Sequence, residues 1–178
     1  MLTDAQRLLL VAVAREAVRA AVTGEPGADG MPVVAAQASG AFVTIKRAGE
    51  LRGCIGTLQC RASLGIEIAR CAVGAALEDP RFLPVQPSEL SDLTFELSIL
   101  APLERLDPCD PALIEIGRHG LVVRHGRCRG LLLPQVAPEW NWTAPEFLAH
   151  TCRKAGLSAD AWRRGAEVYR FVADVFGD

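Results

Sequence analysis

The sequence lacks a hydrophobic segment long enough to cross a membrane. Its first apolar run, Leu8–Ala14, is short and lies between Arg7 and Arg15, with Asp4 ahead of it. A membrane-spanning helix needs about 20 apolar residues, and a signal peptide carries positive charges ahead of its apolar segment. We therefore expect a soluble cytoplasmic protein, in which the six cysteines are reduced thiols and not a disulfide framework.

The common cofactor motifs are also missing. The sequence has no glycine-rich phosphate loop, no dinucleotide-binding fingerprint and no iron–sulfur cysteine cluster. His119, His125 and Cys128 offer metal ligands, but a matching second pair is missing, so we do not expect a zinc site. The sequence thus predicts neither a cofactor nor a bound metal.

A large excess of charge of one sign is likewise absent, because the formal net charge is −2. Half of the 178 residues are hydrophobic, which is typical of a globular protein. Locally, four arginines and no acid lie between Arg118 and Arg129. Such a segment is either a solvated charged turn or a site for a phosphate or carboxylate. RNA binding is a weaker alternative, because the segment lacks paired aromatic residues for base stacking.

What the sequence does contain is an unusual strand segment, Leu51–Gly56, which reads Leu-Arg-Gly-Cys-Ile-Gly. Glycine is disfavoured in strands, so two glycines around one cysteine need a reason. In a regular strand Arg52, Cys54 and Gly56 share one face, which places a cation within about 7 Å of the thiol. A nearby cation favours the reactive thiolate form of a cysteine.

Two interpretations of this segment remain open. In the first, Cys54 is a nucleophile or transient carrier and Arg52 stabilises the thiolate or an anionic substrate. Gly53 and Gly56 then let the substrate approach the backbone, and Ile55 completes the candidate ligand site. In the second, the cysteine is a small buried residue and the glycines permit close packing.

The first half of the chain, about 33–101, predicts a hairpin, a helix and a strand. A capped helix over 4–22 precedes it. Within it, Ser63 is placed to cap a helix that ends near Asp79, because Pro80 disfavours helix at its predecessor.

The second half, about 113–178, repeats this order, with a capping box at Thr143 opening its helix and Gly156 ending it. Arg129-Gly130 corresponds to Arg52-Gly53, and Leu131 stands where the first half has Cys54. We predict a single α+β domain over 1–178. Its duplicated hairpin-helix-strand units share a mainly antiparallel sheet and are flanked by helices.

Five segments resemble the signature of the AMME chromosomal region domain family, and they follow one another in the expected order. They are Gly40–Lys46, Leu51–Thr57, Asp79–Phe82, Leu131–Val136 and Lys154–Leu157. The resemblance spans nearly the whole chain. It implies a compact α+β domain with an internal duplication, and a function for the Leu-Arg-Gly-Cys-Ile-Gly motif.

The resemblance also implies partners. Prokaryotic members of the family are the A component of the AmmeMemoRadiSam set, whose other components are a Memo-like protein and a radical SAM protein. Either an active or ligand site centred on Cys54, or a non-catalytic binding or scaffold module for one of these partners, agrees with this association. Radical chemistry would belong to a partner, because this chain has no iron–sulfur cysteine cluster.

Other residues are candidates for the same site. Asp79 and Arg81 could position Arg52 or bind an anion, or they could form a structural ion pair at the helix end. Three further candidates for ligand binding, ahead of the second helix, are Gln135, Glu139 and Trp142. Their polar groups and flat aromatic surface suit a ligand, although packing over a core edge would explain them equally well.

Overall fold

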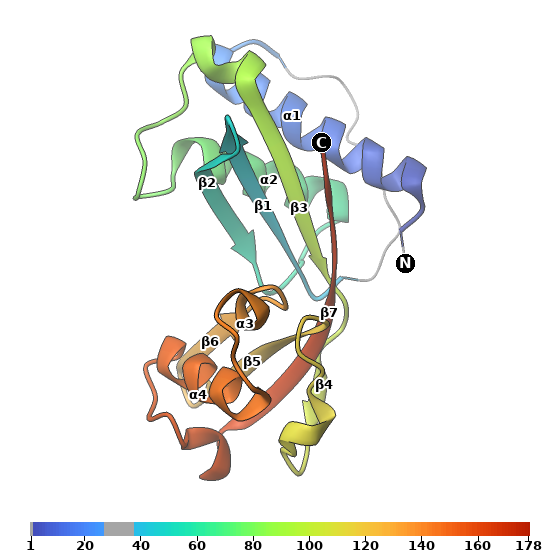
Figure 1. Ribbon diagram of the computed structural model, residues 1–178. Coiled ribbons are helices and arrows are strands. Elements are labelled where there is room, and N and C mark those ends of the chain that lie inside the picture. The colour runs from blue at the N-terminus through green and yellow to red at the C-terminus, as the bar shows by residue number, and fades with distance from the viewer. Residues whose placement is uncertain (1, 27–37) are drawn as a thin grey trace. The chain divides into compact units, whose positions relative to one another are not determined.

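The computed structural model describes residues 2–26 and 38–178, which form two compact units (Figure 1). Unit 1 comprises the residues up to Leu100 together with Asp174–Asp178, and unit 2 comprises Ala101–Ala173. Within the two described stretches, no helix has both the length and the apolar character that a membrane span requires. The predicted start of the first half, at about residue 33, lies outside the described residues.

Unit 1 combines two helices with an antiparallel sheet. Its elements are α1 (Asp4–Thr23), β1 (Gly40–Arg47), β2 (Glu50–Thr57), α2 (Leu64–Leu77), the 3-10 helix η1 (Pro87–Asp92) and β3 (Leu93–Leu100). Strand β1 lies between β2 and β3 and pairs antiparallel with both. The end of strand β7 (Glu167–Gly177) follows β3 in the strand order.

Local sequence signals explain where α1 begins and ends. Thr3 and Gln6 form the capping box, with the Gln6 backbone N–H donating to Thr3 Oγ1 and the Thr3 N–H donating to Gln6 Oε1. Gly24 ends the helix in a left-handed conformation, at φ 72°. The prediction of a helix over 4–22 is therefore confirmed.

The start of α2 differs from the prediction, because the Ser63 side chain makes no capping hydrogen bond. Instead the buried Glu67 carboxylate accepts hydrogen bonds from the backbone N–H groups of Arg61 and Ala62, at 2.8 and 3.1 Å. Arg70, one turn later, donates to the same carboxylate. An acid in the first turn of the helix thus organises the loop ahead of it.

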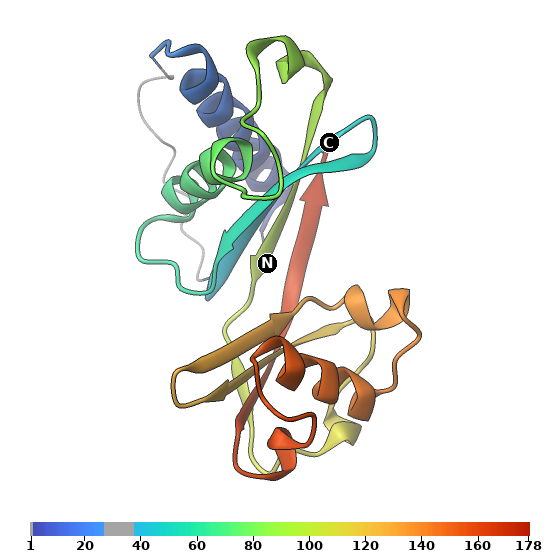
Figure 2. The ribbon, with the colours of Figure 1, turned by 90° about the vertical axis from the view of Figure 1, so that its left-hand side faces the viewer.

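Both helices of unit 1 cover the same face of its sheet (Figure 2). Alternate residues of β1, namely Ala41, Val43 and Ile45, are buried on this face with α1 and α2 in one apolar core. The residues between them point to the opposite face, which we call the open face. Register places Thr44 and Lys46 of β1 on the open face, together with Cys54 of β2 and Glu96 of β3.

Unit 2 repeats the same arrangement. Its elements are β4 (Glu104–Leu106), η2 (Pro111–Leu113), β5 (His119–His125), β6 (Cys128–Leu132), α3 (Val136–Glu139), α4 (Ala144–Lys154), η3 (Ala161–Arg163) and β7. Strand β5 lies between β6 and β7, as β1 lies between β2 and β3. Every strand pair described within the two units is antiparallel, so the predicted fold class, a duplicated α+β unit with helices flanking an antiparallel sheet, is confirmed.

Helix α4 also begins and ends where its capping residues predict. The Glu146 carboxylate accepts from the Thr143 backbone N–H at 2.8 Å, and Gly156 follows the helix at φ 75°. Four short elements were not predicted, namely η1, β4, η2 and α3. Each spans six residues or fewer, too short for a periodic pattern to identify.

Candidate functional site

Gly53 is the point where strand β2 meets helix α2. A Cβ atom at this position would overlap the carbonyl oxygen of Ala75, so only glycine lets the strand and the helix backbone come this close. Gly74, on the same helix, faces the side chain of Ile55, which packs against the core. Helix–strand packing thus accounts for both residues, while the role of Gly53 and Ile55 in receiving a ligand stays a prediction.

Gly56 has a comparable role on the open face. A Cβ atom there would collide with the ring of Phe42, its cross-strand partner on β1. The aromatic ring thus occupies the space that the sequence suggested for a ligand. Packing against Phe42 thus accounts for this glycine, while its role in a ligand site stays a prediction.

Arg52 lies at a β-bulge. The register between β1 and β2 shifts at this point, with Ile45 opposite Gly53 but Lys46 opposite Leu51, so that Arg52 is the extra residue. A bulge re-aims a side chain, and the simple alternation that placed Arg52 and Cys54 on one face does not apply across it.

The guanidinium of Arg52 pairs with Glu89 of η1 and not with the thiol. Nε donates to Oε1 at 2.9 Å and Nη2 donates to Oε2 at 3.0 Å, a two-point ion pair in which Arg52 is 15 % exposed. Arg47 adds a third contact to Glu89. The Arg52 guanidinium lowers the pKa of Glu89 to about 2. In this structure Arg52 therefore meets Glu89, and its role toward the thiolate or an anionic substrate stays a prediction.

Cys54 is half-buried and is held by two neighbours. Its backbone N–H donates to Asp79 Oδ2 at 2.9 Å, and its Sγ accepts a hydrogen bond from Thr44 Oγ1 at 3.3 Å. Thr44 is its direct cross-strand partner on β1. Because β2 is the outer strand of the sheet, the carboxylate of Asp79 satisfies a backbone donor at the sheet edge.

Asp79 connects Cys54 to Arg81. The Asp79 carboxylate is buried, and it also accepts from the Arg81 guanidinium through Nε at 2.9 Å and Nη2 at 2.7 Å. These hydrogen bonds, with those from the Cys54 and Arg81 backbone, hold the pKa of Asp79 well below its usual range. The Asp79 carboxylate in turn raises the pKa of Arg81. The cation that Asp79 links to the Cys54 backbone is therefore Arg81.

The sequence interpretation missed two residues of this arrangement. Thr44 carried no signal of its own, because a threonine in a strand is ordinary. Glu89 was detectable as the acid of a capping box, since it accepts from the backbone N–H of Gln86 at the start of η1. Thr44 lies on the other strand of the same hairpin, whereas Glu89 is far from the motif in sequence.

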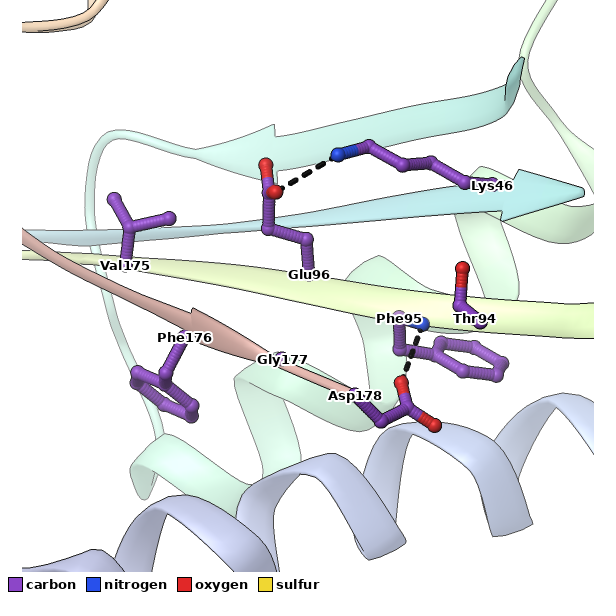
Figure 3. Close-up of a pocket in the computed structure, with 8 residues that line it drawn as sticks. All are labelled: Lys46, Thr94, Phe95, Glu96, Val175, Phe176, Gly177 and Asp178. Carbon is purple, nitrogen blue, oxygen red and sulfur yellow. Dashed lines mark hydrogen bonds and ion pairs between the residues drawn. The ribbon is translucent and has the colours of Figure 1, made fainter. Parts of the chain in front are cut away.

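A pocket of about 270 Å³ opens in unit 1 between strands β1, β3 and β7 (Figure 3). The ion pair of Lys46 Nζ with Glu96 Oε2, at 2.8 Å, lines it, opposite Val175. Thr44 pairs with Cys54 on one side and with Glu96 on the other, so one row of side chains leads from the thiol to the pocket across the open face.

The remaining candidates, Gln135, Glu139 and Trp142, belong to unit 2. The short helix α3 begins after Gln135 and ends at Glu139. The Glu139 backbone N–H donates to the Gln135 carbonyl oxygen. Trp142 stacks on His150, with ring centroids 3.7 Å apart, and packs against the core of unit 2. Packing thus explains Trp142, while the ligand role of Gln135 and Glu139 stays a prediction.

The histidines are not gathered into a metal site. Among the described residues there is no group of three or more His, Cys, Asp or Glu side chains arranged to hold a metal ion. His119 instead accepts from the backbone N–H of Glu115 through Nδ1, at 2.9 Å. Burial and the nearby Arg170 lower the pKa of His119.

Comparisons with known proteins agree with this architecture. The sequence model of the AMMECR1 family matches residues 11–176. A protein of Methanosarcina acetivorans is 44 % identical over 186 residues, covering 99 % of this chain and 93 % of its own. One of Methanothermobacter thermautotrophicus is 46 % identical over 175 residues, covering 94 % and 91 %.

A solved structure is similar as well. The crystal structure of an uncharacterised protein from Pyrococcus horikoshii superimposes with a TM-score of 0.86 at 36 % sequence identity. The similarity covers 99 % of this chain and 93 % of that one. The fold is therefore shared over nearly the whole length of both chains.

Proposed function

The chain belongs to the AMMECR1 family, and we propose that it acts through a thiol-centred ligand site at Cys54, as a cytoplasmic component of an AmmeMemoRadiSam-type system. In this site Cys54 is the group that reacts with or holds the ligand. Thr44 donates a hydrogen bond to its sulfur, and Arg81 binds an anionic group of the ligand.

One observation carries the proposal. Asp79 accepts hydrogen bonds from both the Cys54 backbone and the Arg81 guanidinium, so a single buried carboxylate links the backbone of the cysteine to a cation at the strand edge. Asp79 engages Nε and Nη2 of Arg81, whose side chain is 54 % exposed. The outward side of this guanidinium is therefore available to an anion.

The experiment is thiol labelling at pH 7 with mass-spectrometric assignment to each of the six cysteines. The exposed Cys128 serves as the internal reference for an ordinary accessible thiol, and the buried Cys152 for an inaccessible one. We expect Cys54 to react at least as fast as Cys128 although it is half-buried, because the Thr44 hydroxyl bonds its sulfur and Asp79 holds the Arg81 guanidinium at the same residue.

Matched arginine variants make this test specific. Arg81→Gln should slow labelling of Cys54 several-fold, and Thr44→Val should do the same. Arg52→Gln removes an equal charge from the motif that contains Cys54. It should leave the labelling rate of Cys54 unchanged, because the Arg52 guanidinium is bound to Glu89. Equal slowing by both arginine variants, or labelling of Cys54 as slow as that of Cys152, would refute the proposal.

A partner-binding module is the second candidate function, and the loop after α2 favours it. Leu83 is 83 % exposed beside Arg81, while backbone hydrogen bonds from Phe82 to Asp79 and from Val85 to Ala76 hold the loop. An exposed apolar side chain on a loop that backbone hydrogen bonds keep in one conformation is well placed to contact a protein partner.

Co-purification with the Memo-like and the radical SAM protein of the same genome tests this module. If the module is the function, Leu83→Ser should abolish co-purification while Cys54→Ser preserves it. Loss in Cys54→Ser alone would instead support the thiol site.

A further inference from the structure

The sheet of unit 2 carries a set of charged side chains that the Cys54 site does not use. Arg129 of β6 pairs with Arg124 of β5, and Arg124 pairs with Glu167 of β7. On β7, two residues after Glu167, Tyr169 is the cross-strand partner of Arg105 of β4. Because cross-strand partners and alternate residues share a face, these five side chains lie on one face of the sheet. We call it the arginine face.

The opposite face of this sheet is the packed one. Leu121, Val123 and Val168 are buried there against Phe147 of α4. Gly130 also lies against the α4 backbone. Helix α4 therefore packs on the face opposite to the arginine face and does not cover the hairpin end of the arginine face.

Positive charge on the arginine face exceeds negative charge. Arg124 and Arg129 are directly opposite each other, a like-charge pairing that is unfavourable in a sheet. Partial burial and the neighbouring Arg124 lower the pKa of Arg129. The Glu167 carboxylate lies 3.7 Å from Arg105 Nη1 and accepts from the Tyr169 hydroxyl at 3.3 Å.

Arg124 is held in place by an aromatic ring and not by an acid. Its guanidinium carbon lies 4.9 Å from the centre of the Tyr169 ring. Its Nε is buried and finds no hydrogen-bond partner within the part of the chain that the structure describes. A guanidinium fixed by stacking, beside a second one, has little conformational entropy left to lose on binding an anion.

We propose that the arginine face binds a phosphate-type oxyanion, the phosphate group of a small molecule. Such a group accepts paired hydrogen bonds from guanidinium groups and offsets the repulsion between Arg124 and Arg129. The site is independent of Cys54 and adds a second ligand to this protein.

Thermal denaturation and calorimetry with inorganic phosphate test the proposal on the full chain. We expect phosphate to raise the melting temperature saturably. Arg124→Gln and Arg129→Gln should each weaken phosphate binding by about tenfold or more, as expected for the loss of a charge-assisted hydrogen bond. Arg163→Gln is the matched control, because it removes the same charge from a residue of unit 2 that lies over Trp162.

The outcomes separate a site from a general charge effect. Retention of binding in Arg163→Gln, with loss in the other two variants and circular dichroism spectra unchanged in all three, supports the proposal. Equal loss in all three variants, or no response of the wild type to millimolar phosphate, overturns it. Tight, salt-sensitive binding of a single-stranded RNA without any response to inorganic phosphate also overturns it, in favour of a nucleic-acid surface.

Discussion

The two hairpins of the molecule share one feature and differ in another. In unit 1 Gly53 lies against the backbone of α2 at Ala75, and in unit 2 Gly130 lies against the backbone of α4 at Thr151 and Ala155. The same contact recurs although the neighbouring residues differ. The glycine of the Leu-Arg-Gly-Cys-Ile-Gly motif therefore belongs to the fold, because it is needed wherever this unit closes a helix onto a hairpin.

The difference lies in what surrounds each glycine. The preceding arginine meets Glu89 in unit 1, whereas Arg129 in unit 2 stands opposite Arg124. The following residue is Cys54 in one unit and Leu131 in the other. Features that occur once, and that the fold does not require, are the better candidates for function.

The largest expected effect comes from the shared glycines. Gly53→Ala and Gly130→Ala should each lower the free energy of unfolding by about 3 kcal/mol or more, because a rigid helix backbone cannot move away from the added methyl group. Chemical denaturation followed by circular dichroism measures this.

Gly74→Ala is the matched control for these variants. Its methyl group would meet side-chain atoms only, with Ile55 Cγ2 at 3.2 Å and Glu78 Oε2 at 3.7 Å, and alanine favours a helix over glycine, so the change should be close to neutral. If Gly53→Ala were as mild as Gly74→Ala, the packing explanation for the motif would be lost.

A smaller effect concerns the pH dependence of stability, which should differ between the two units. The pKa of Asp79 is held well below its usual range and that of Glu89 is lowered to about 2, so both groups stabilise the folded state most above about pH 4. This stabilisation should be lost as the pH falls through the folded-state values. Asp79→Asn should cost about 2 kcal/mol at pH 7 and make the decline with acid shallower.

Urea unfolding at a series of pH values between about 7 and 2 measures this decline. Glu104→Gln in unit 2 is the control, because it also breaks an arginine ion pair but at an exposed position. An equal loss of stability in both variants would show that the buried network around Cys54 has no special role in the fold.

The smallest effect concerns the residue that distinguishes the units. Cys54→Leu installs the residue that unit 2 has at the corresponding position, and it should change the free energy of unfolding by less than about 1 kcal/mol. The half-buried site on the open face can accommodate a larger apolar side chain. A large fall in melting temperature, by differential scanning calorimetry, would show instead that the fold requires the cysteine.

Much of the fold followed from local patterns in the chain. The capping box of Thr3 and Gln6, the one at Thr143 and the glycine at position 156 each act within four residues, so their outcome hardly depends on the rest of the molecule. The repeated order of hairpin, helix and strand then indicated the duplication. The interpretation of Ser63 as a cap was wrong because Glu67 organises that turn instead.

The site could be predicted only in part. The sequence by itself determined that a cysteine, two glycines and an arginine lie together in one strand, since they are neighbours in the chain. Tertiary structure decided which groups they meet. A one-residue bulge moved Arg52 to Glu89, and folding brought Asp79 and Arg81 to Cys54 from 25 or more residues away. Strand alternation holds only while the register is unbroken, and no local pattern records contacts made across such a separation.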